Sequence, residues 1–379
     1  MGVIYADNAA TTRLSDTAFD AMKPYMLNEY GNASTLYKLG RSAHKAVENA
    51  RGVFAKGINA LPAEIYFTSG GTESDNWAIK GTAHRLAASG KKHIVTDNIE
   101  HHAVLNSAKA LEREGFEVTC VSADKNGLVL AEDVAAAIRP DTAMVSVMFA
   151  NNELGTIQPV AEIGSICRSA GVLFHCDAVQ AAGILPIDVK AMNIDLLSMS
   201  AHKFHGPKGV GVMYARRGCV PETYIDGGEQ ERGHRAGTEN VAGIVGAAAA
   251  FAEAISERNE KADRLCAMRD EIQSGLMKIP GSQVNGVTAP RLPGTLNMSF
   301  DGIDGQSLIF ELDLKGLAAS SGSACASGSV NPSHVLLALG LPYKLAHGSL
   351  RLSLGRYNTP DEAEMIIRIV SDTVAELRG

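Results

Sequence analysis

Hydrophobic runs rich in β-branched residues alternate with longer helical patterns from about Leu14 to Val245. Strands joined by helices predict parallel pairing, with helices covering both faces of one sheet. The runs show little alternation of polar and apolar residues, as expected for strands buried on both faces. The predicted strands are Glu64–Thr68, His93–Thr96, Glu117–Val121, Ala143–Met148, Leu173–Asp177, Leu196–Met199 and Gly211–Tyr214. The predicted helices between them include Glu73–Ala88, His102–Glu114 and Val160–Ala170.

The pattern changes after about Ser256. A long charged helix is predicted at Glu257–Met277, then strands near Gly294–Phe300 and Leu350–Ser353, and a last helix at Pro360–Leu377. The chain is therefore predicted to be an α/β protein with a large, mostly parallel-sheet domain over residues 14–256. A smaller α+β domain is predicted from residues 1–13 and 257–379, and it carries the segment around Cys325.

The composition narrows the class of protein. Of 379 residues, 45% are hydrophobic and 20% charged, which is typical of a globular chain. The net charge of -7 gives no general attraction for nucleic acid or an anionic membrane, so neither is an expected direct partner. No apolar stretch approaches the ~20 residues of a membrane span, and Val241–Ala252 is expected to be a buried helix. Met1–Asp7 lacks the pattern of a secretory signal, so a cytoplasmic location is expected.

The cysteines form no CxxC pairs and have no histidine partners at zinc-finger spacing, so no disulfide framework and no metal site are predicted. Most are expected to be small buried hydrophobic residues. Cys325 differs because Ser320–Ser329 around it consists of small, polar residues. Such a segment is typical of a mobile loop with a reactive thiol, but equally of a surface loop with an incidental cysteine. The cysteines expected to be buried are Cys120, Cys167, Cys176, Cys219 and Cys266.

Three polar features follow predicted strands. The adjacent glycines and hydroxyls of Thr68–Ser74 open a helix and suit an anion, although an ordinary helix cap has the same pattern. Asp177 ends a strand, where ligands collect in α/β sheets. Lys203 precedes a Gly-Pro turn and is a candidate for imine formation with an aldehyde cofactor. Together they match the needs of pyridoxal phosphate (PLP), and the chain resembles the fold-type I PLP-dependent transferases.

Two more segments place polar side chains directly after strands. In Glu100-His101-His102, spacing alone lets either histidine stack on a flat ring or move protons. Asn152 occupies a similar position after a later strand.

A longer series of segments resembles the NifS/IscS-like cysteine desulfurases, in the order found in that family. The resemblance runs to about Gly355, and its SSGSAC segment is similar to the group with a long mobile cysteine loop rather than the shorter-loop group with RxGxxC. It implies a PLP enzyme that converts L-cysteine to L-alanine and forms a persulfide on Cys325. The segments are DNAATT, SGGTESDN, EHHAVL, NNELG, HCDAVQ, SAHKFHGPKG, RAGTEN and SSGSACASGS.

The resemblance also implies roles for single residues. Lys203 would hold the cofactor covalently and move protons, Asp177 would pair with the ring nitrogen, and His101, rather than His102, would stack on the ring and transfer protons. Arg351 and, less directly, Asn32 would bind the substrate carboxylate. The other cofactor ligands implied are Gly71, Thr72, Asn152, Gln180, Ser200, His202 and, from a neighbouring subunit, Thr238.

The implied partners are a second copy of the chain and a sulfur-acceptor protein, either an iron–sulfur scaffold or a tRNA thiolase. Selenocysteine lyase activity and an aminotransferase or β-elimination lyase of the same fold stay open as alternatives. A non-catalytic partner protein is disfavoured because Lys203, Asp177, His101 and Cys325 are all intact.

Three features depart from the family pattern. Tyr37 stands where the family often has histidine, with Ala33 in place of proline, and Glu229 replaces the third glycine of a GGGQE run. These departures leave the details of the entry loops open. The chain also stops at Gly379, earlier than desulfurases whose C-terminal extension contacts an iron–sulfur scaffold, which leaves the acceptor open.

Overall fold

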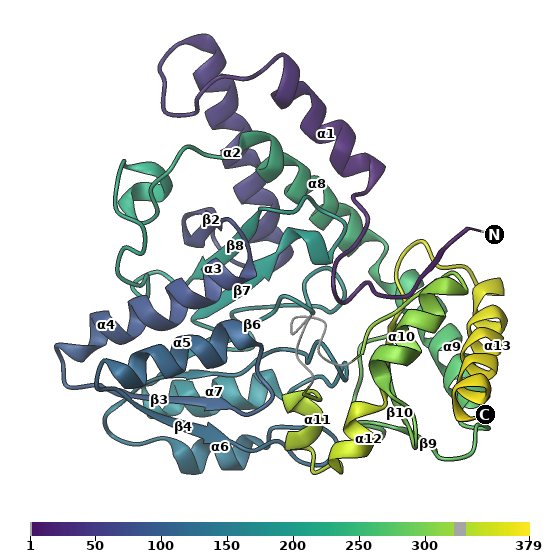
Figure 1. Ribbon diagram of the computed structural model, residues 1–379. Helices are drawn as coiled ribbons and strands as arrows, with labels where there is room; N and C mark the ends of the chain where they lie inside the picture. The colour runs from purple at the N-terminus through teal and green to yellow at the C-terminus, as the bar shows by residue number, and fades with distance from the viewer. Residues whose placement is uncertain (1, 322–330) are drawn as a thin grey trace.

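A seven-stranded sheet forms the centre of the computed structural model, which describes residues 2–321 and 331–379. The strands lie in the order β2-β8-β7-β6-β5-β3-β4 (Figure 1). Their bounds are β2 Ile65–Thr68, β3 His93–Asp97, β4 Glu117–Val121, β5 Thr142–Ser146, β6 Leu173–Asp177, β7 Leu196–Ser200 and β8 Gly211–Ala215.

The sheet is mostly parallel, with one exception. β8 runs antiparallel to both of its neighbours, β7 and β2, so the expectation of parallel pairing is wrong for Gly211–Tyr214. The reason is the short connection from Ser200 to Gly211, since a parallel crossover needs a dozen or more residues and usually a helix. This short connection contains Lys203.

Most strands of the sheet are fully buried, including the edge strand β2, and β4 at the other edge is the most exposed. Every residue of β2, β3, β5, β7 and β8 is buried, which explains why these strands lack alternation. β4 is an edge strand, and its burial pattern is mixed. Cys120 on β4 is exposed, so the expectation that it is a buried hydrophobic residue is wrong, whereas Cys167, Cys176 and Cys219 are buried.

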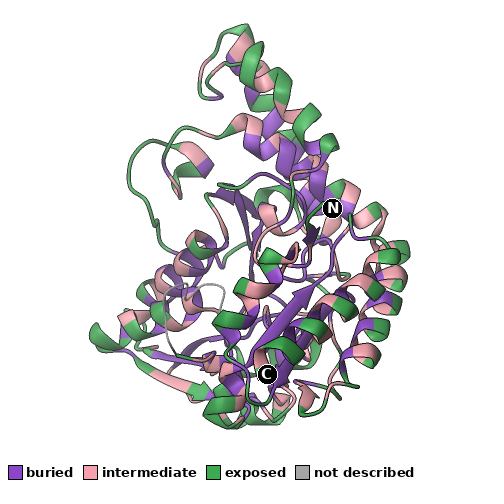
Figure 2. Cartoon of the chain, turned by 45° about the vertical axis from the view of Figure 1, so that its right-hand side comes forward, coloured by how far each residue is buried: buried purple, intermediate pink, exposed green. Residues whose placement is uncertain are grey.

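Helices cover both faces of the sheet, and Figure 2 shows their outer sides exposed above buried strands. The predicted helix Glu73–Ala88 is divided, because a turn of π-helix at Trp77–Gly81 separates α3 from α4. The helix bounds here are α3 Gly71–Asn76, α4 Thr82–Ala87, α5 His102–Arg113, α6 Ala131–Ala137 and α7 Val160–Ala170. Helices α1 (Asp16–Leu27) and α2 (Lys38–Gly57) pack on α8 (Val241–Ser256) and project from one end of the molecule (Figure 1).

A second, smaller sheet lies beside the first. Its antiparallel strands have the order β12-β10-β9 and are packed against helices α9, α10 and α13. The N-terminal strand β1 (Ile4–Tyr5) joins this part by pairing with β11 (Leu317–Ala318). The bounds are α9 Arg258–Leu276, β9 Ser282–Val284, β10 Thr295–Phe300, α10 Gly305–Leu314, β12 Ser349–Ser353 and α13 Asp361–Arg378.

Among the described residues, the buried hydrophobic side chains form a large and a smaller cluster on the seven-stranded sheet and a separate core under the smaller sheet. Short helices α11 (His334–Ala338) and α12 (Tyr343–His347) come late in the chain, yet their Val335, Leu336 and Ala346 pack in the large core. The chain therefore returns to the large domain after Cys325, and a division near Ser256 stays a prediction. Within the described residues, no helix combines the length and apolar character required to span a bilayer.

Candidate active site

A cavity of about 340 Å³ opens where β6 and β7 end. Ligands collect at such strand ends in α/β sheets, and the volume lies in the range of small-molecule sites. The sequence-predicted residues that line it are Gly71, Thr72, His101, Asn152, Asp177, Gln180, Ser200, His202, Lys203 and Arg351. One cavity thus brings together residues from segments up to 280 positions apart along the chain, from Gly71 to Arg351 (351 − 71 = 280).

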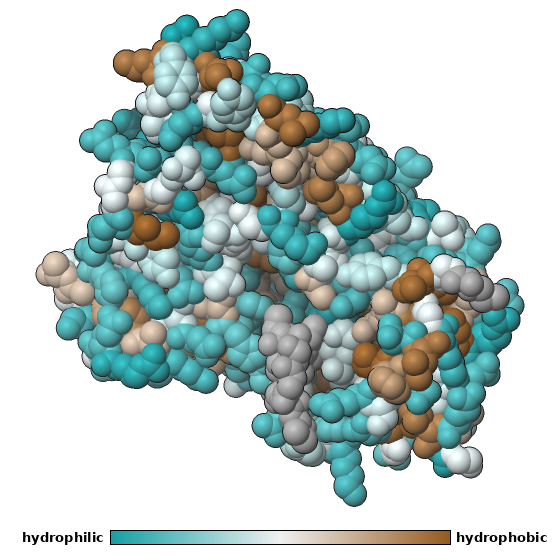
Figure 3. Space-filling model, turned by 45° about the horizontal axis from the view of Figure 1, so that its top comes forward, coloured by the Kyte–Doolittle hydropathy of each residue, from teal (hydrophilic) through white to brown (hydrophobic). Residues whose placement is uncertain are grey.

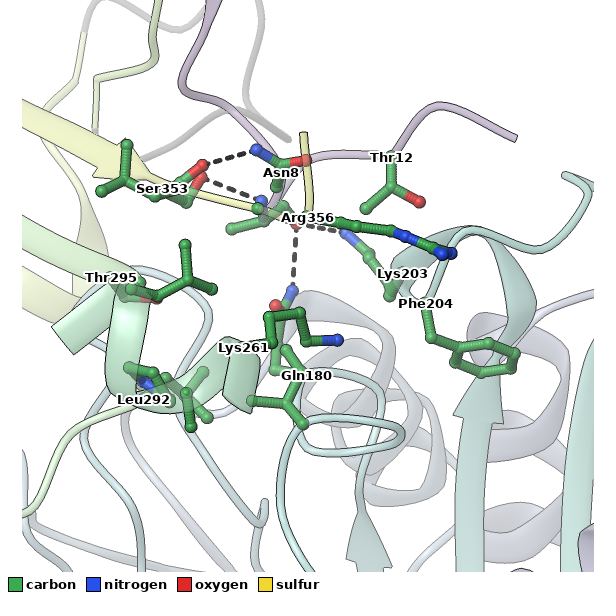
Figure 4. A pocket seen from close by; sticks show the side chains of 18 of the residues that line it. Asn8, Thr12, Gln180, Lys203, Phe204, Lys261, Leu292, Thr295, Ser353 and Arg356 are labelled. Atoms are coloured by element: carbon green, nitrogen blue, oxygen red, sulfur yellow. Dashed lines mark hydrogen bonds between the residues drawn. The ribbon is translucent and has the colours of Figure 1, made fainter. Parts of the chain in front are cut away.

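Lys203 follows β7 in a short 3-10 turn, and its Nζ donates hydrogen bonds to the carbonyl oxygens of Ala9 at 2.5 Å and Ala10 at 2.8 Å. Gln180 Nε2 donates to the same Ala9 oxygen at 3.0 Å. Figure 4 views the neighbouring pocket, which Lys203 and Gln180 also line, and shows both side chains directed toward the N-terminal segment beside Asn8, with Ser353 on its other side. Ala9 and Ala10 of this segment line the cavity of about 340 Å³ itself. The segment therefore forms a wall of the cavity.

Asp177 is buried at the end of β6. Burial raises the pKa of its carboxyl to about 6, against the opposite effects of a hydrogen bond from the Val179 N–H and the charge of Lys203. A cation placed beside this carboxyl would favour its ionised form. Asp177 can therefore pair with a protonated ring nitrogen.

His101 is the N-cap of α5, and its Nδ1 accepts a hydrogen bond from the Ala103 N–H at 3.1 Å. Burial, followed by the charges of the neighbouring Lys203, His102 and His334, lowers the pKa of the imidazole to about 4. The ring is thus neutral at physiological pH, and its proton lies on Nε2 because Nδ1 is the acceptor. His102 does not line the cavity and instead packs against His334, with ring centroids 4.6 Å apart.

The glycine-rich turn lies at another side of the cavity. A side chain at Gly71 would bring its Cβ within 2.6 Å of Val179 Cγ2, so the close approach of α3 to this wall requires glycine. Thr72 and Ser200 line the cavity nearby, as does His202, whose Nδ1 lies 3.1 Å from Thr11 Oγ1. Hydroxyls, an imidazole and the first N–H groups of a helix are groups that bind phosphate.

Arg351 stands in the middle of β12 and is 1% exposed. Its NH2 donates to Asp7 Oδ1 at 2.7 Å and its NH1 to the Asn152 carbonyl oxygen at 3.1 Å. No described residue forms a hydrogen bond with its Nε. A buried guanidinium at the cavity wall whose N–H groups are not all used by described residues is suited to binding a carboxylate ligand.

Two of the predicted site residues that the structure describes, Asn32 and Thr238, do not line this cavity. Asn32 is exposed, and its Oδ1 accepts a hydrogen bond from the Ser34 N–H. Thr238 is also exposed. Neither side chain reaches the cavity within one chain. Cys325 lies outside the described residues.

Sequence reasoning assigned no site role to Asp75 or to the N-terminal segment, although both belong to segments of the family resemblance. Asp75 is 1% exposed and lines the cavity beside Asp177. The SGGTESDN segment contained a signal for Asp75. Asp75 lies four residues after Gly71 in a helix, and residues at this spacing lie on the same face. Ala9 and Ala10 contribute backbone carbonyl oxygens to Lys203, a role that the side-chain types of DNAATT do not indicate.

Known proteins resemble this chain over almost its whole length. The model of the aminotransferase class-V family matches residues 4–366. Cysteine desulfurase IscS of Methanosarcina thermophila is 50% identical over 99% of this chain and 93% of its own length. That of Dictyoglomus turgidum is 46% identical over 99% of this chain and 95% of its own.

Solved structures agree with the sequence matches. A NifS-like protein superimposes with a TM-score of 0.93 at 39% identity, covering 99% of this chain and 100% of that one. The structure of SspA in complex with cysteine has a TM-score of 0.83 at 36% identity, covering 94% and 99%. The predicted fold class and family are confirmed. The chain belongs to the aminotransferase class-V family and, within it, to the NifS/IscS-like cysteine desulfurases.

Proposed function

We propose that this cysteine desulfurase binds PLP in the cavity at the ends of β6 and β7. The proposal rests on the combination of polar groups that line the cavity. These are the Thr72 hydroxyl and the helix N–H groups at Gly71 and Thr72, the buried carboxyl of Asp177 and the amine of Lys203. These groups fit the phosphate, the ring nitrogen and the aldehyde of the cofactor, respectively. When bound, PLP supplies an aldehyde that condenses with amines and a ring that accepts electrons from the substrate.

The surrounding residues perform the remaining steps. Arg351 would hold the carboxylate of L-cysteine and orient its α-carbon, and the Lys203 amine would take the α-proton. His101, which is neutral with its proton on Nε2, stacks on the ring and exchanges protons. Gln180 and Asn152, which line the cavity, would hold the polar edge of the ring, and Ser200 and His202 would complete the phosphate site.

Arg351→Lys tests the proposed carboxylate site. Lysine keeps the positive charge but loses the paired N–H groups that bind a carboxylate at two points. We expect kcat/KM for L-cysteine to fall by about 10- to 100-fold, mainly through a higher KM. Steady-state kinetics of alanine formation measure this, with Arg378→Lys on α13 as the matched control. An unchanged KM would assign the carboxylate to another residue.

Sulfur leaves the substrate on Cys325 in this proposal. The thiolate attacks the substrate sulfur, so that an S–S bond forms and the C–S bond breaks. The electron pair of the broken bond remains with the substrate carbon, which takes up a proton and becomes alanine. The other site residues match the desulfurase motifs in the order found in that family, which supports this role for Cys325. Selenocysteine, with the same geometry at its heavier atom, is the alternative substrate.

The persulfide gives a direct test of the proposed function. After L-cysteine is added to the purified holoenzyme, intact-mass and peptide mass spectrometry should show one added sulfur atom on Cys325 and on none of the other cysteines. The mass increase should disappear when an acceptor thiol is supplied. Sulfur found on exposed Cys120 instead of Cys325 would overturn the assignment.

We also propose that the enzyme works in the cytoplasm as a homodimer that passes sulfur to an acceptor protein, either an iron–sulfur scaffold or a tRNA thiolase. Thr238 is exposed, as a residue that reaches the phosphate of a neighbouring subunit must be. Hydrophobic side chains are also exposed on the projecting α1–α2 end, which comes forward in Figure 3. They are Phe19, Met26, Leu27, Tyr30, Leu36 and Tyr37.

A further inference from the structure

A row of buried polar side chains crosses the central strands of the large sheet. Ser146 on β5 is in register with His175 on β6, and Ser198 on β7 is in register with Asp177. His175 and Asp177 are two residues apart on one strand, so they point to the same face. All of these residues are buried. The row therefore connects the interior of the sheet to the proposed cofactor site at Asp177.

His175 in this row is neutral. Its Nδ1 lies 2.8 Å from Ser146 Oγ and its Nε2 lies 3.1 Å from Ser198 Oγ, so a hydroxyl occupies each ring nitrogen. Burial lowers the pKa of the imidazole to about 3. The row thus provides hydrogen-bonding partners but no positive charge.

Asp75 reaches this row from α3, on the cavity side. Its carboxyl is hydrogen-bonded by Ser198, whereas its Oδ1 lies 3.6 Å from His175 Nε2 and forms no hydrogen bond with any described residue. The ionisable groups whose charges act around it are carboxyls, namely Asp177 on β6 and Glu100 before α5. Two cations, Lys203 and Arg351, line the same cavity, and the charge of Lys203 acts on Asp177.

An ionised Asp75 would be a buried anion beside other buried acids, without a cation in contact among the described residues. Such a charge is strongly unfavourable, and a buried carboxyl avoids it by keeping its proton. We propose that Asp75 stays a neutral carboxylic acid in the folded chain and acts as a positioning residue, so that Asp177 is the carboxylate that faces the cofactor ring. The part that concerns the cofactor rests on the proposed function.

The pKa of Asp75 is raised, first by burial and then by the charge of Asp177, and this determines the sign of the pH effect. A raised pKa in the folded state means that the folded chain binds the proton more tightly than the unfolded chain does. The bound proton therefore adds to the free energy of unfolding. This contribution is fully present below about 3.9, the pKa of aspartate in the unfolded chain, and is lost as the pH rises toward the pKa of Asp75 in the folded chain. Asparagine at position 75 does not ionise, so Asp75→Asn removes this pH-dependent contribution to the stability of the folded chain.

The test compares wild-type protein, Asp75→Asn and Asp75→Leu, each as the full chain without cofactor. Urea unfolding is measured between roughly pH 5 and roughly pH 7. Relative to Asp75→Asn, the unfolding equilibrium constant of the wild type should increase by up to about tenfold per pH unit, which is the effect of one proton. The other buried acids are present in both proteins, so their effects largely cancel. Asp133→Asn, at an exposed acid of α6, should keep the wild-type slope.

Binding of PLP to the same proteins, followed by its visible absorbance, provides the second measurement. Asp75→Leu removes the polar contact with the Ser198 hydroxyl and should raise the Kd for PLP by about tenfold or more, whereas asparagine should restore most of the affinity. An unchanged pH slope in Asp75→Asn, or a loss of affinity equal to that of the leucine variant, would show that Asp75 is ionised and would overturn the inference. If the wild type itself failed to bind PLP, the proposed function would fail, while the unfolding slopes would still decide the charge state of Asp75.

Discussion

Lys203→Ala should abolish the visible absorbance of a lysine-bound cofactor and lower the rate of alanine formation by about 10³-fold or more. Alanine supplies neither the amine that holds the aldehyde nor a base for the α-proton. The effect is expected to be large because Lys203 Nζ is the amine at the cavity wall where the aldehyde is proposed to lie. Absorbance spectra and alanine assays on the purified variant measure both losses.

Lys208→Ala provides the matched control, because this lysine is exposed and lies only five residues further along the chain (208 − 203 = 5). The control should keep both the spectrum and the rate. If Lys203→Ala kept more than about one tenth of the wild-type rate, the proposed assignment of the covalent amine and the α-proton base would be wrong.

Cys325→Ala should lower alanine formation from L-cysteine by about 100-fold or more in the presence of a reducing thiol. The C–S bond breaks when a thiolate takes the sulfur, and alanine offers no thiolate. Cofactor binding should stay normal, since Cys325 does not belong to the proposed cofactor ligands. Alanine assays combined with absorbance spectra separate the two steps.

Cys120→Ala is the control for Cys325, because Cys120 is an exposed cysteine on edge strand β4 and distant in sequence. It should turn over L-cysteine at the wild-type rate. A normal rate in Cys325→Ala would refute the persulfide mechanism and favour a β-elimination lyase or an aminotransferase of the same fold.

The fold could be predicted well wherever local patterns and burial agree. The strands Glu117–Val121 and Leu173–Asp177 and the helix Val160–Ala170 have the predicted bounds, because the change from strand to helical periodicity is sharp there. The direction of β8 could not be predicted from its own residues. A buried strand has the same composition in either direction, and the length of the connection decides the direction.

The polar segments at strand ends predicted much of the candidate site, since parallel strands bring their carboxyl ends to one edge of the sheet. That rule places Asp177 and Lys203 near each other without any knowledge of distant contacts. It does not place Arg351, which comes from another sheet and meets Asp7 and Asn152 only after the two parts of the chain pack together.

The sequence alone determined the order of strands and helices along the chain, the family resemblance and the types of chemical group available to the site. These properties depend on neighbouring residues, so a linear pattern contains them. The tertiary structure decided which histidine lines the cavity, which backbone carbonyls receive the Lys203 amine and how Asp75 comes to lie beside His175 and Asp177. Burial and electrostatic environment arise from residues distant in sequence, and therefore the charge states of these groups depend on the folded chain.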